Sequence, residues 1–403
     1  MKLLAQHGHA EGQKVLDGIR NNLIDGVIFS PKDIRLDNLA TKCASILDAH
    51  PSSEVLLDPQ VYTALFANDP GANLGWLEEY EGYFKPLTRS RLEIEKNVRD
   101  VLRDSVAFQK KIRLTGIIAP NILISRSFDS REATISKTFI RLAKDVARKL
   151  KVSMPVYSTL AVSREALTNP EELKEFLNDI TVVDSPPDGI YLLIAGRSTE
   201  SRLEIFNADV ISGWLLMNFS FTINGLKVIN GYSDIVTPFL GVVGGEMGAS
   251  GWYSNLRMFS MERFLPVAKG GRQAIQRYLS KALLNRIRFD EYRAWSEILP
   301  DIKNNLQYDS PFEQSADPKT QEDEPTRNDE LYQSWEALKS IINDLVVDDI
   351  SEGIKKSEAT LERADSIYEK IKELGIRPDA KSNRDHVEPL REGIREFRRL
   401  AQI

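Results

Sequence analysis

The sequence is poor in residues that bind metals or form cross-links. Of 403 residues, one is a cysteine, Cys43, and four are histidines. A single thiol excludes an intrachain disulfide and every zinc site built from two or more thiolates. His7 and His9 could join a distant carboxylate at a metal, but an isolated His-x-His pair is more typical of ordinary surface. We therefore expect no structural metal, no zinc and no cofactor.

Long hydrophobic runs are absent as well. No apolar stretch approaches the roughly 20 residues that span a bilayer, and the segment from Met1 to His7 is too short and polar for a signal peptide. The 53 Lys and Arg residues against 59 Asp and Glu give a formal net charge of −6. This composition predicts a cytoplasmic globular protein with no membrane association.

The acidic excess lies in one stretch, residues 305–330, which holds eight acids against two bases together with Pro311, Pro318 and Pro325. Such a segment buries too little apolar surface to offset its ordering entropy, so we expect an acidic flexible linker. It would divide a domain at 1–304 from a helical region at 331–403. The domain itself is nearly neutral, which disfavours a general electrostatic grip on nucleic acid.

Upstream of residue 305, short β-branched runs alternate with amphipathic segments, the pattern of βα units. The expected helices are Arg91–Phe108, Ser130–Leu150 and Pro170–Leu177. The expected strands are Gly26–Phe29, Val55–Leu57, Leu114–Ala119, Pro155–Leu160, Gly189–Ile194 and Leu226–Ile229, with others near 246–251 and 264–267. Because no Gly-x-Gly-x-x-Gly follows the first strand, a (β/α)₈ TIM-type barrel fits better than a doubly wound sheet.

The helical region shows three periodic apolar patterns, over residues 335–345, 354–374 and 387–401. The last of these carries Arg391, Arg395 and Arg398 on its other face, and a solvated helix face explains this stripe better than an anion site. The prediction is a barrel with a C-terminal α-helical extension.

Reactive side chains of a parallel barrel stand at the carboxyl ends of its strands. Four segments qualify: Asp58, Asp129, Ala195-Gly196-Arg197, and the loop 244–252. Carboxylates there can act as acid, base or nucleophile, or accept N–H donors from a guanine-like edge. For Asp129, a helix cap or Asx-turn is an equally good explanation.

The order of these segments resembles the tRNA-guanine transglycosylase superfamily over residues 20–270. Phe128-Asp129-Ser130 is similar to the family's Phe-Asp-Glu-Cys segment, whose aspartate recognises the base, and Asp58 matches its catalytic acid/base aspartate. Met154–Thr159 and Asp188–Gly196 resemble its next two strands. The resemblance implies a base pocket, and the residues expected to border it are Asp58, Asp129, Phe128, Ala195, Gly196, Arg197, Tyr157 and Trp252, with Tyr62 as a further aromatic.

The departures from this family concern its chemistry. The nucleophilic aspartate falls on Ala249, the thiolate zinc motif is missing, and Glu246 would point to the other face of its strand. We therefore expect no catalytic residues; Asp58 and Glu246 are the candidates if activity survives.

A silenced transglycosylase fold with a helical tail resembles the transglycosylase-like accessory proteins of type IV CBASS anti-phage operons. These sit beside a QueC-like enzyme and a cGAS-like nucleotidyltransferase. The resemblance implies antiviral defence through recognition of a 7-deazaguanine-type base carried by a protein partner, the nucleotidyltransferase.

Two alternatives stay open. An active guanine or 7-deazaguanine transglycosylase (a pentosyltransferase) on DNA or tRNA would need a basic path, for which the candidates are Arg257, Arg263, Lys269, Arg272, Arg277, Arg286 and Arg288. A metabolic barrel enzyme would use Gly241–Gly251 as a phosphate loop, although its glycine spacing matches no known phosphate motif.

Overall fold

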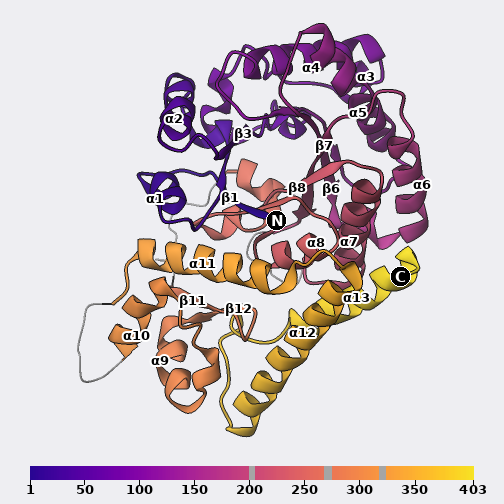
Figure 1. The fold of residues 1–403 in the computed structure, drawn as a ribbon. Coiled ribbons are helices and arrows are strands. Elements are labelled where there is room, and N and C mark those ends of the chain that lie inside the picture. The colour runs from indigo at the N-terminus through magenta and orange to yellow at the C-terminus, as the bar shows by residue number, and fades with distance from the viewer. Residues whose placement is uncertain (199–204, 267–274, 317–323) are drawn as a thin grey trace.

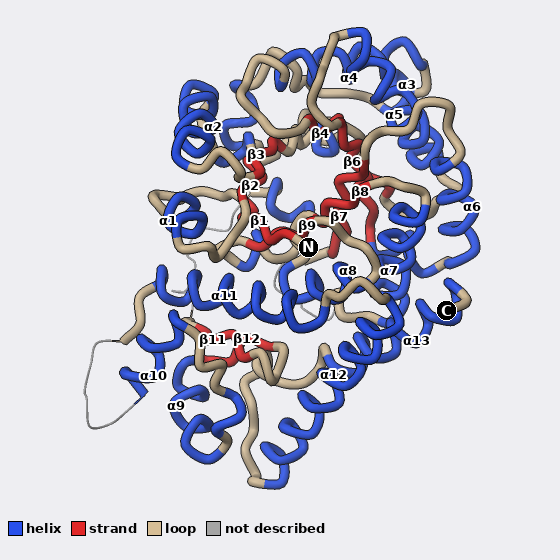
Figure 2. Tube along the Cα trace, viewed as in Figure 1, coloured by secondary structure: helices blue, strands red, loops and turns tan. Residues whose placement is uncertain are grey.

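A computed structural model describes residues 1–198, 205–266, 275–316 and 324–403, and its centre is a ring of parallel strands (Figures 1 and 2). The eight strands of the ring are β1 (Lys2–Gln6), β2 (Gly26–Phe29), β3 (Glu54–Leu57), β4 (Ile117–Ala119), β6 (Val156–Ser163), β7 (Gly189–Gly196), β8 (Lys227–Asn230) and β9 (Met247–Ser250). Their order is β3-β2-β1-β9-β8-β7-β6-β4, and every hydrogen-bonded neighbour is parallel. The predicted (β/α)₈ barrel is confirmed.

The ring closes between β3 and β4 through Thr115, two residues before β4. The Thr115 amide donates to the Val55 carbonyl at 2.9 Å, and the Thr115 hydroxyl accepts from the Val55 amide at 3.0 Å. Two short strands lie off the ring: β5 (Leu123–Ile124) pairs with β6, and β10 (Phe259–Ser260) pairs with β7.

Helices surround the ring on its outside (Figure 2). Those of the barrel region are α1 (Lys14–Arg20), α2 (Leu36–Ala49), α3 (Arg89–Leu92), α4 (Glu95–Gln109), α5 (Arg131–Lys149), α6 (Pro170–Thr181), α7 (Ala208–Ile223) and α8 (Thr237–Val242). The Ser130 hydroxyl caps α5 by accepting from the Ala133 amide, and the Asn169 side chain caps α6, with Pro170 following at its first position.

The first strand was missed in the sequence. Lys2–Gln6 is β1, flanked by β2 and β9 at the middle of the sheet, although the segment was considered only as a leader. The weakest expected strand, 264–267, is not one: Phe264 ends a 3₁₀ turn, Met261–Phe264, and residue 267 lies outside the described residues.

The C-terminal region begins with a hairpin, β11 (Arg277–Ser280) and β12 (Asn285–Arg288), and continues through α9 (Phe289–Ile298), α10 (Ser310–Ala316), α11 (Arg327–Leu345), α12 (Ile350–Glu373) and α13 (Val387–Ala401). The last three helices match the three expected from periodicity. Figure 1 shows α11 running between the barrel and the hairpin.

Helix α11 completes the barrel. Buried Trp335 donates its indole N–H to the Ser250 carbonyl, at the end of β9, at 3.1 Å. The same ring packs on Gly18 of α1, where an added Cβ would stand 2.8 Å from it. No long helix follows β9 within the described residues 251–266, and α11 covers the seam between the last strand and the first. The boundary expected at residue 304 therefore separates parts of one hydrophobic core.

The expected flexible linker is folded where the structure describes it. Residues 307–309 form a 3₁₀ turn and α10 follows, with Asp309 and Phe312 fully buried. The Asp309 carboxylate accepts from the Leu306 amide at 2.9 Å and from the Gln333 side chain at 3.3 Å. These contacts bury a segment whose acidic composition had predicted exposure to solvent. Residues 317–323 lie outside the described part.

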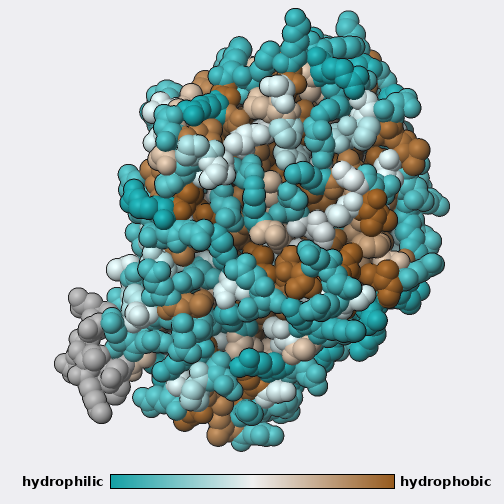
Figure 3. Space-filling view, viewed as in Figure 1, coloured by the Kyte–Doolittle hydropathy of each residue, from teal (hydrophilic) through white to brown (hydrophobic). Residues whose placement is uncertain are grey.

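Helix α13 packs closely on α7. At Gly393 an added Cβ would lie 2.6 Å from the side chain of Ile211, so glycine allows the two helices to approach. The visible surface in Figure 3 is mostly hydrophilic, with apolar side chains in separate patches. Across the described ranges, no helix has the length and apolarity needed to cross a membrane.

Candidate functional site

Strand register identifies the side chains that enter the barrel at its carboxyl end. Leu4 pairs with Ala249, and Gln6, two residues later, faces the same side and pairs with Ile28. Ile28 in turn pairs with Leu56, so Asp58 continues the inward row just after β3. Gln6 and Asp58 are both 0% exposed.

Asp58 is the centre of a buried polar cluster. Its carboxylate accepts hydrogen bonds from the Tyr62 hydroxyl at 2.8 Å, the Tyr191 hydroxyl at 3.2 Å and the Gln60 amide at 3.1 Å. Tyr191 belongs to β7, across the ring from β3, so its hydroxyl spans the interior. Gln60 holds a left-handed backbone conformation, with φ of 55°, that turns the chain back toward the carboxylate.

Burial dominates the electrostatics of this cluster. It raises the pKa of Asp58 to about 6, against the opposing effect of hydrogen bonds from Tyr62, Gln60 and Tyr191. Burial, followed by the nearby Asp58 charge, raises the pKa of Tyr62 and Tyr191 well above the usual range. The tyrosines therefore remain proton donors while the carboxyl titrates near neutrality.

A second buried charged side chain, that of Arg263, lies next to this cluster. Arg263, 3% exposed at its side chain, forms an ion pair with Asp33 and hydrogen bonds with the hydroxyls of Tyr232 and Ser30. Burial opposes its charge, but Tyr232 and Asp33 together raise the pKa of Arg263 above its ordinary value. The 3₁₀ turn that carries Arg263 thus closes the barrel mouth.

Aromatic contacts hold the same cover in place. Tyr62 packs edge-on against Phe259 and Phe264, with ring centroids 5.1 and 6.0 Å apart, and Tyr232 lies 5.3 Å from Phe259. Beside them, burial lowers the pKa of Lys32 to about 8, and its ammonium donates to the Asn73 carbonyl at 2.5 Å.

Only part of the predicted set joins Asp58. Tyr62 does, and the buried backbone of Ala195 and Gly196 lies at the end of β7, but β10 pairs with these two residues and covers that edge. Arg197 lies outside: its side chain is 68% exposed and donates to Glu165 at 2.6 Å.

Phe128 and Asp129 do not enter the cluster. Phe128 is buried against Phe176 of α6, with centroids 4.7 Å apart. Asp129 is exposed, and its backbone amide donates to the Ser127 hydroxyl at 2.9 Å. The helix cap suspected at Asp129 is supplied by Ser130 instead.

Tyr157 and Glu246 lie at the opposite end of the barrel. Tyr157 is the second residue of β6, and Glu246 directly precedes β9 and pairs with Lys227 at 3.1 Å. Asp58, by contrast, follows its strand. Asp58 and Glu246 therefore cannot act together as catalytic groups, as the sequence suggested, because parallel strands place their starts and their ends at opposite mouths of the barrel.

Trp252 stays near the carboxyl end but packs on another residue. Its ring meets His7 edge-on at 6.0 Å, and its indole donates to the His9 carbonyl at 2.8 Å. His7, expected on the surface, is 2% exposed, and its Nε2 lies 3.4 Å from the Glu11 carboxylate. Within the described ranges, no three His, Cys, Asp or Glu side chains are grouped to hold a metal.

The expected basic path is mostly internal. Arg263 pairs with Asp33, Arg277 with Asp379 and Arg286 with Asp234, while Arg257 is largely buried and burial lowers its pKa to about 10. Arg288 pairs with Asp290, and Lys269 and Arg272 lie outside the described residues. Such paired guanidinium groups form no phosphate groove. The glycines between 241 and 251 form no phosphate loop either, because Gly241 belongs to α8 and 247–250 is β9.

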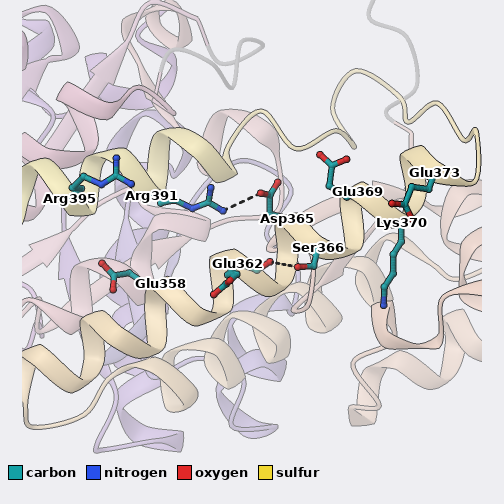
Figure 4. Close-up of a pocket in the computed structure, with 9 residues that line it drawn as sticks. All are labelled: Glu358, Glu362, Asp365, Ser366, Glu369, Lys370, Glu373, Arg391 and Arg395. Atoms are coloured by element: carbon teal, nitrogen blue, oxygen red, sulfur yellow. Dashed lines mark hydrogen bonds and ion pairs between the residues drawn. The ribbon is translucent and has the colours of Figure 1, made fainter.

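A separate groove of about 710 Å³ opens between α12 and α13 (Figure 4). Its lining residues are Glu358, Glu362, Asp365, Ser366, Glu369, Lys370, Glu373, Arg391 and Arg395. Arg391 pairs with Asp365 at 3.2 Å and Arg395 with Glu392 at 2.6 Å, so the arginine stripe is engaged with acids of the same two helices. This supports the solvated-face interpretation.

Comparison with known proteins gives matches among solved structures and no sequence match. No family model and no curated sequence matches the chain. Among solved structures, the dihydrodipicolinate synthase from Oceanobacillus iheyensis aligns over 98% of this chain and 96% of its own, at 12% identity and a TM-score of 0.26. A similarity this weak supports no functional argument, and the fold assignment stands on the strand pairing described above.

The sequence contained some signal for the residues that were missed. Tyr191 lies in a segment that was expected to be a strand. Because side chains alternate between the two faces of a strand, Tyr191 faces the interior of the barrel on the same side as Gly189. Gln6 was hidden because its strand was not recognised. Arg263 was expected only as part of a basic path for nucleic acid, since nothing local indicates that Asp33 pairs with it 230 residues away.

Proposed function

We propose that this chain is a transglycosylase-like barrel protein that recognises a 7-deazaguanine-type base without transferring it. The base would be carried by a protein partner, a CBASS cGAS-like nucleotidyltransferase in anti-phage defence. The observation that carries the proposal is the buried Asp58 carboxylate at the carboxyl end of β3, held by Tyr62 and Tyr191. A carboxylate in that place can accept the ring N–H and amino hydrogens of a guanine-type edge.

The lack of glycosyl transfer rests on Ala249. In the resemblance this position holds the nucleophile, and here it is an inward, fully buried methyl group in β9. Glu246 does not replace it, because Glu246 stands at the other mouth of the barrel. Recognition is thus separated from chemistry, and a base would bind without its glycosidic bond being attacked.

Calorimetric titration with 7-deazaguanine tests the recognition step. We expect Asp58→Asn to lose the affinity, since the amide replaces one of the two acceptor oxygens of the carboxylate by an NH2 donor, which would face a donor of the base. Asp129→Asn is the matched control: its exposed carboxylate competes with water, so we expect an unchanged affinity. Loss of binding in Asp129→Asn alone would reassign recognition to the residue implied by the resemblance.

Labelled guanine exchange into tRNA or duplex DNA tests the absence of transfer, and turnover would refute it.

A further inference from the structure

Lys32 is the only buried lysine of the described residues, with 8% of its surface exposed. Lysine is seldom buried without a carboxylate, because an unpaired ammonium loses its hydration. Within the described part of the chain, no Asp or Glu oxygen lies within 4.0 Å of this ammonium, and the neighbouring Asp33 pairs with Arg263 instead. The ammonium donates to the neutral carbonyl of Asn73 at 2.5 Å. Its surroundings therefore do little to hold it in the charged form.

The position of Lys32 is that of a reacting group. It follows β2 by three residues and lies at the mouth where barrel enzymes carry their reactive side chains. Its backbone amide donates to the Gln60 side chain at 3.0 Å, and the Gln60 backbone amide donates to the Asp58 carboxylate at 3.1 Å. The ring at the end of the turn Met261–Phe264 lies 5.5 Å from the ammonium and 6.0 Å from the ring of Tyr62. Lys32 thus borders the polar cluster and shares its cover.

The electrostatics of Lys32 favour the neutral amine. Burial is the largest effect and lowers its pKa to about 8; the nearby Asp33 charge opposes this shift, and the Arg263 charge adds to it. The neutral amine is the nucleophilic form of lysine. At pH 7, a lysine with this pKa holds about two hundred times more neutral amine than an ordinary lysine.

We propose that Lys32 is a nucleophile that forms a Schiff base with a small aliphatic ketone or aldehyde. The amine attacks the carbonyl carbon, so that a C–N bond forms and the oxygen takes the proton that the nitrogen loses. The resulting hydroxyl leaves as water with a proton from solvent, while the nitrogen lone pair forms the C=N bond. The product is a cationic imine, which the face of Phe264 can stabilise as it does the ammonium. This activity is separate from base recognition and does not rest on it.

The covering turn controls access to the amine. Because Lys32 is 8% exposed, a carbonyl compound reaches it only when the turn Met261–Phe264 is displaced. Arg263 holds this turn in place through its ion pair with Asp33. The rate of imine formation is therefore reduced by the fraction of molecules in which the turn is closed.

Reductive trapping on the full chain tests the proposal. The protein is incubated at neutral pH with butanone and sodium cyanoborohydride, and peptide mapping by mass spectrometry follows alkylation at each lysine over time. We expect Lys32 to react at least about tenfold faster than the exposed Lys85, because its larger fraction of neutral amine outweighs its restricted access. Alkylation of Lys32 at a rate equal to or below that of Lys85 would overturn the proposal.

Two variants assign the fast site. Lys32→Met keeps the length of the side chain and removes the amine, and we expect the fast alkylation to disappear; Lys85→Arg is the matched control and should keep it. Persistence of the fast alkylation in Lys32→Met would overturn the proposal. If Lys32→Met fails to fold, the peptide map of the wild type decides, because it locates the adduct without a variant.

Discussion

At the residue scale, the buried carboxyl Asp58 makes stability depend on pH. Its pKa is raised to about 6 from 3.8, so the folded state keeps a proton that the unfolded state has lost over that window. The resulting stabilisation is fully present below pH 3.8 and is lost as the pH rises through 6. Asp309 has the same raised pKa, about 6, in the C-terminal region.

In the wild type, the free energy of unfolding should decrease between pH 4.5 and pH 6.5 as Asp58 loses its proton. We predict that this decrease is about 2 kcal/mol smaller in Asp58→Asn. Urea unfolding at the two pH values measures it. Asp309→Asn is the matched variant, expected to remove a similar amount. A wild-type pH dependence retained in Asp58→Asn would show that the carboxyl titrates normally.

Arg263 offers a second prediction at this scale. Arg263→Met leaves Asp33 buried without its cation, and we expect a loss of about 3 kcal/mol in unfolding free energy. Adding Asp33→Asn should recover part of this loss, because the uncompensated charge is then gone. Chemical denaturation of the two single variants and the double variant measures the coupling; purely additive losses would show that the pair does not interact.

At the element scale, the seam between β9 and β1 depends on a helix from the far end of the chain. Trp335 of α11 is buried on Gly18 and bonded to Ser250. We predict that Trp335→Ala costs about 3–5 kcal/mol and lowers the stability of the whole barrel. The control is Trp76→Ala, at a tryptophan that is 42% exposed, with an expected cost below about 1 kcal/mol. Separate unfolding of the tail and the barrel in thermal scans would contradict this role of α11.

Helix α2 can be probed through the single thiol. Cys43 is buried, and burial raises its pKa to about 12, so the reactive thiolate is scarce in the folded protein. We predict that Ellman's reagent modifies Cys43 only after α2 opens or the chain unfolds. The time course of absorbance, with and without urea, measures it; immediate stoichiometric reaction of the native protein would refute the burial of α2.

Local patterns were sufficient for most elements and insufficient for those decided by distant contacts. The βα alternation predicted the barrel, and helix caps such as Asn169-Pro170 appear as expected. Strand β1 was missed although it is as long as strands that were predicted, because its segment was considered only as a leader. Residues 307–316 look disordered in composition because their stabilising partners, such as Gln333, come later in the chain. Asp58 could be predicted from its place after a strand, whereas its hydrogen bond with Tyr191, 133 residues away, could not, because nothing local indicates that contact.

At the scale of the whole molecule, one core joins the barrel to its C-terminal helices, and the mouth at the carboxyl ends of the strands contains a closed polar cluster. Helix α11 binds the outside of the ring, so it leaves the mouth to the turn that carries Arg263. On the proposed function, a protein partner that delivers a base would have to displace this turn, so recognition would be linked to a change of shape.

The most direct test of the account is to express the protein with the genes that neighbour its own, purify it, and measure the intact masses of whatever remains bound. We predict a stoichiometric protein whose mass exceeds that of its sequence by the mass of a deazaguanine group, and loss of this protein in Asp58→Asn. Co-purified RNA or DNA without such a protein would contradict it and favour a transglycosylase that acts on nucleic acid.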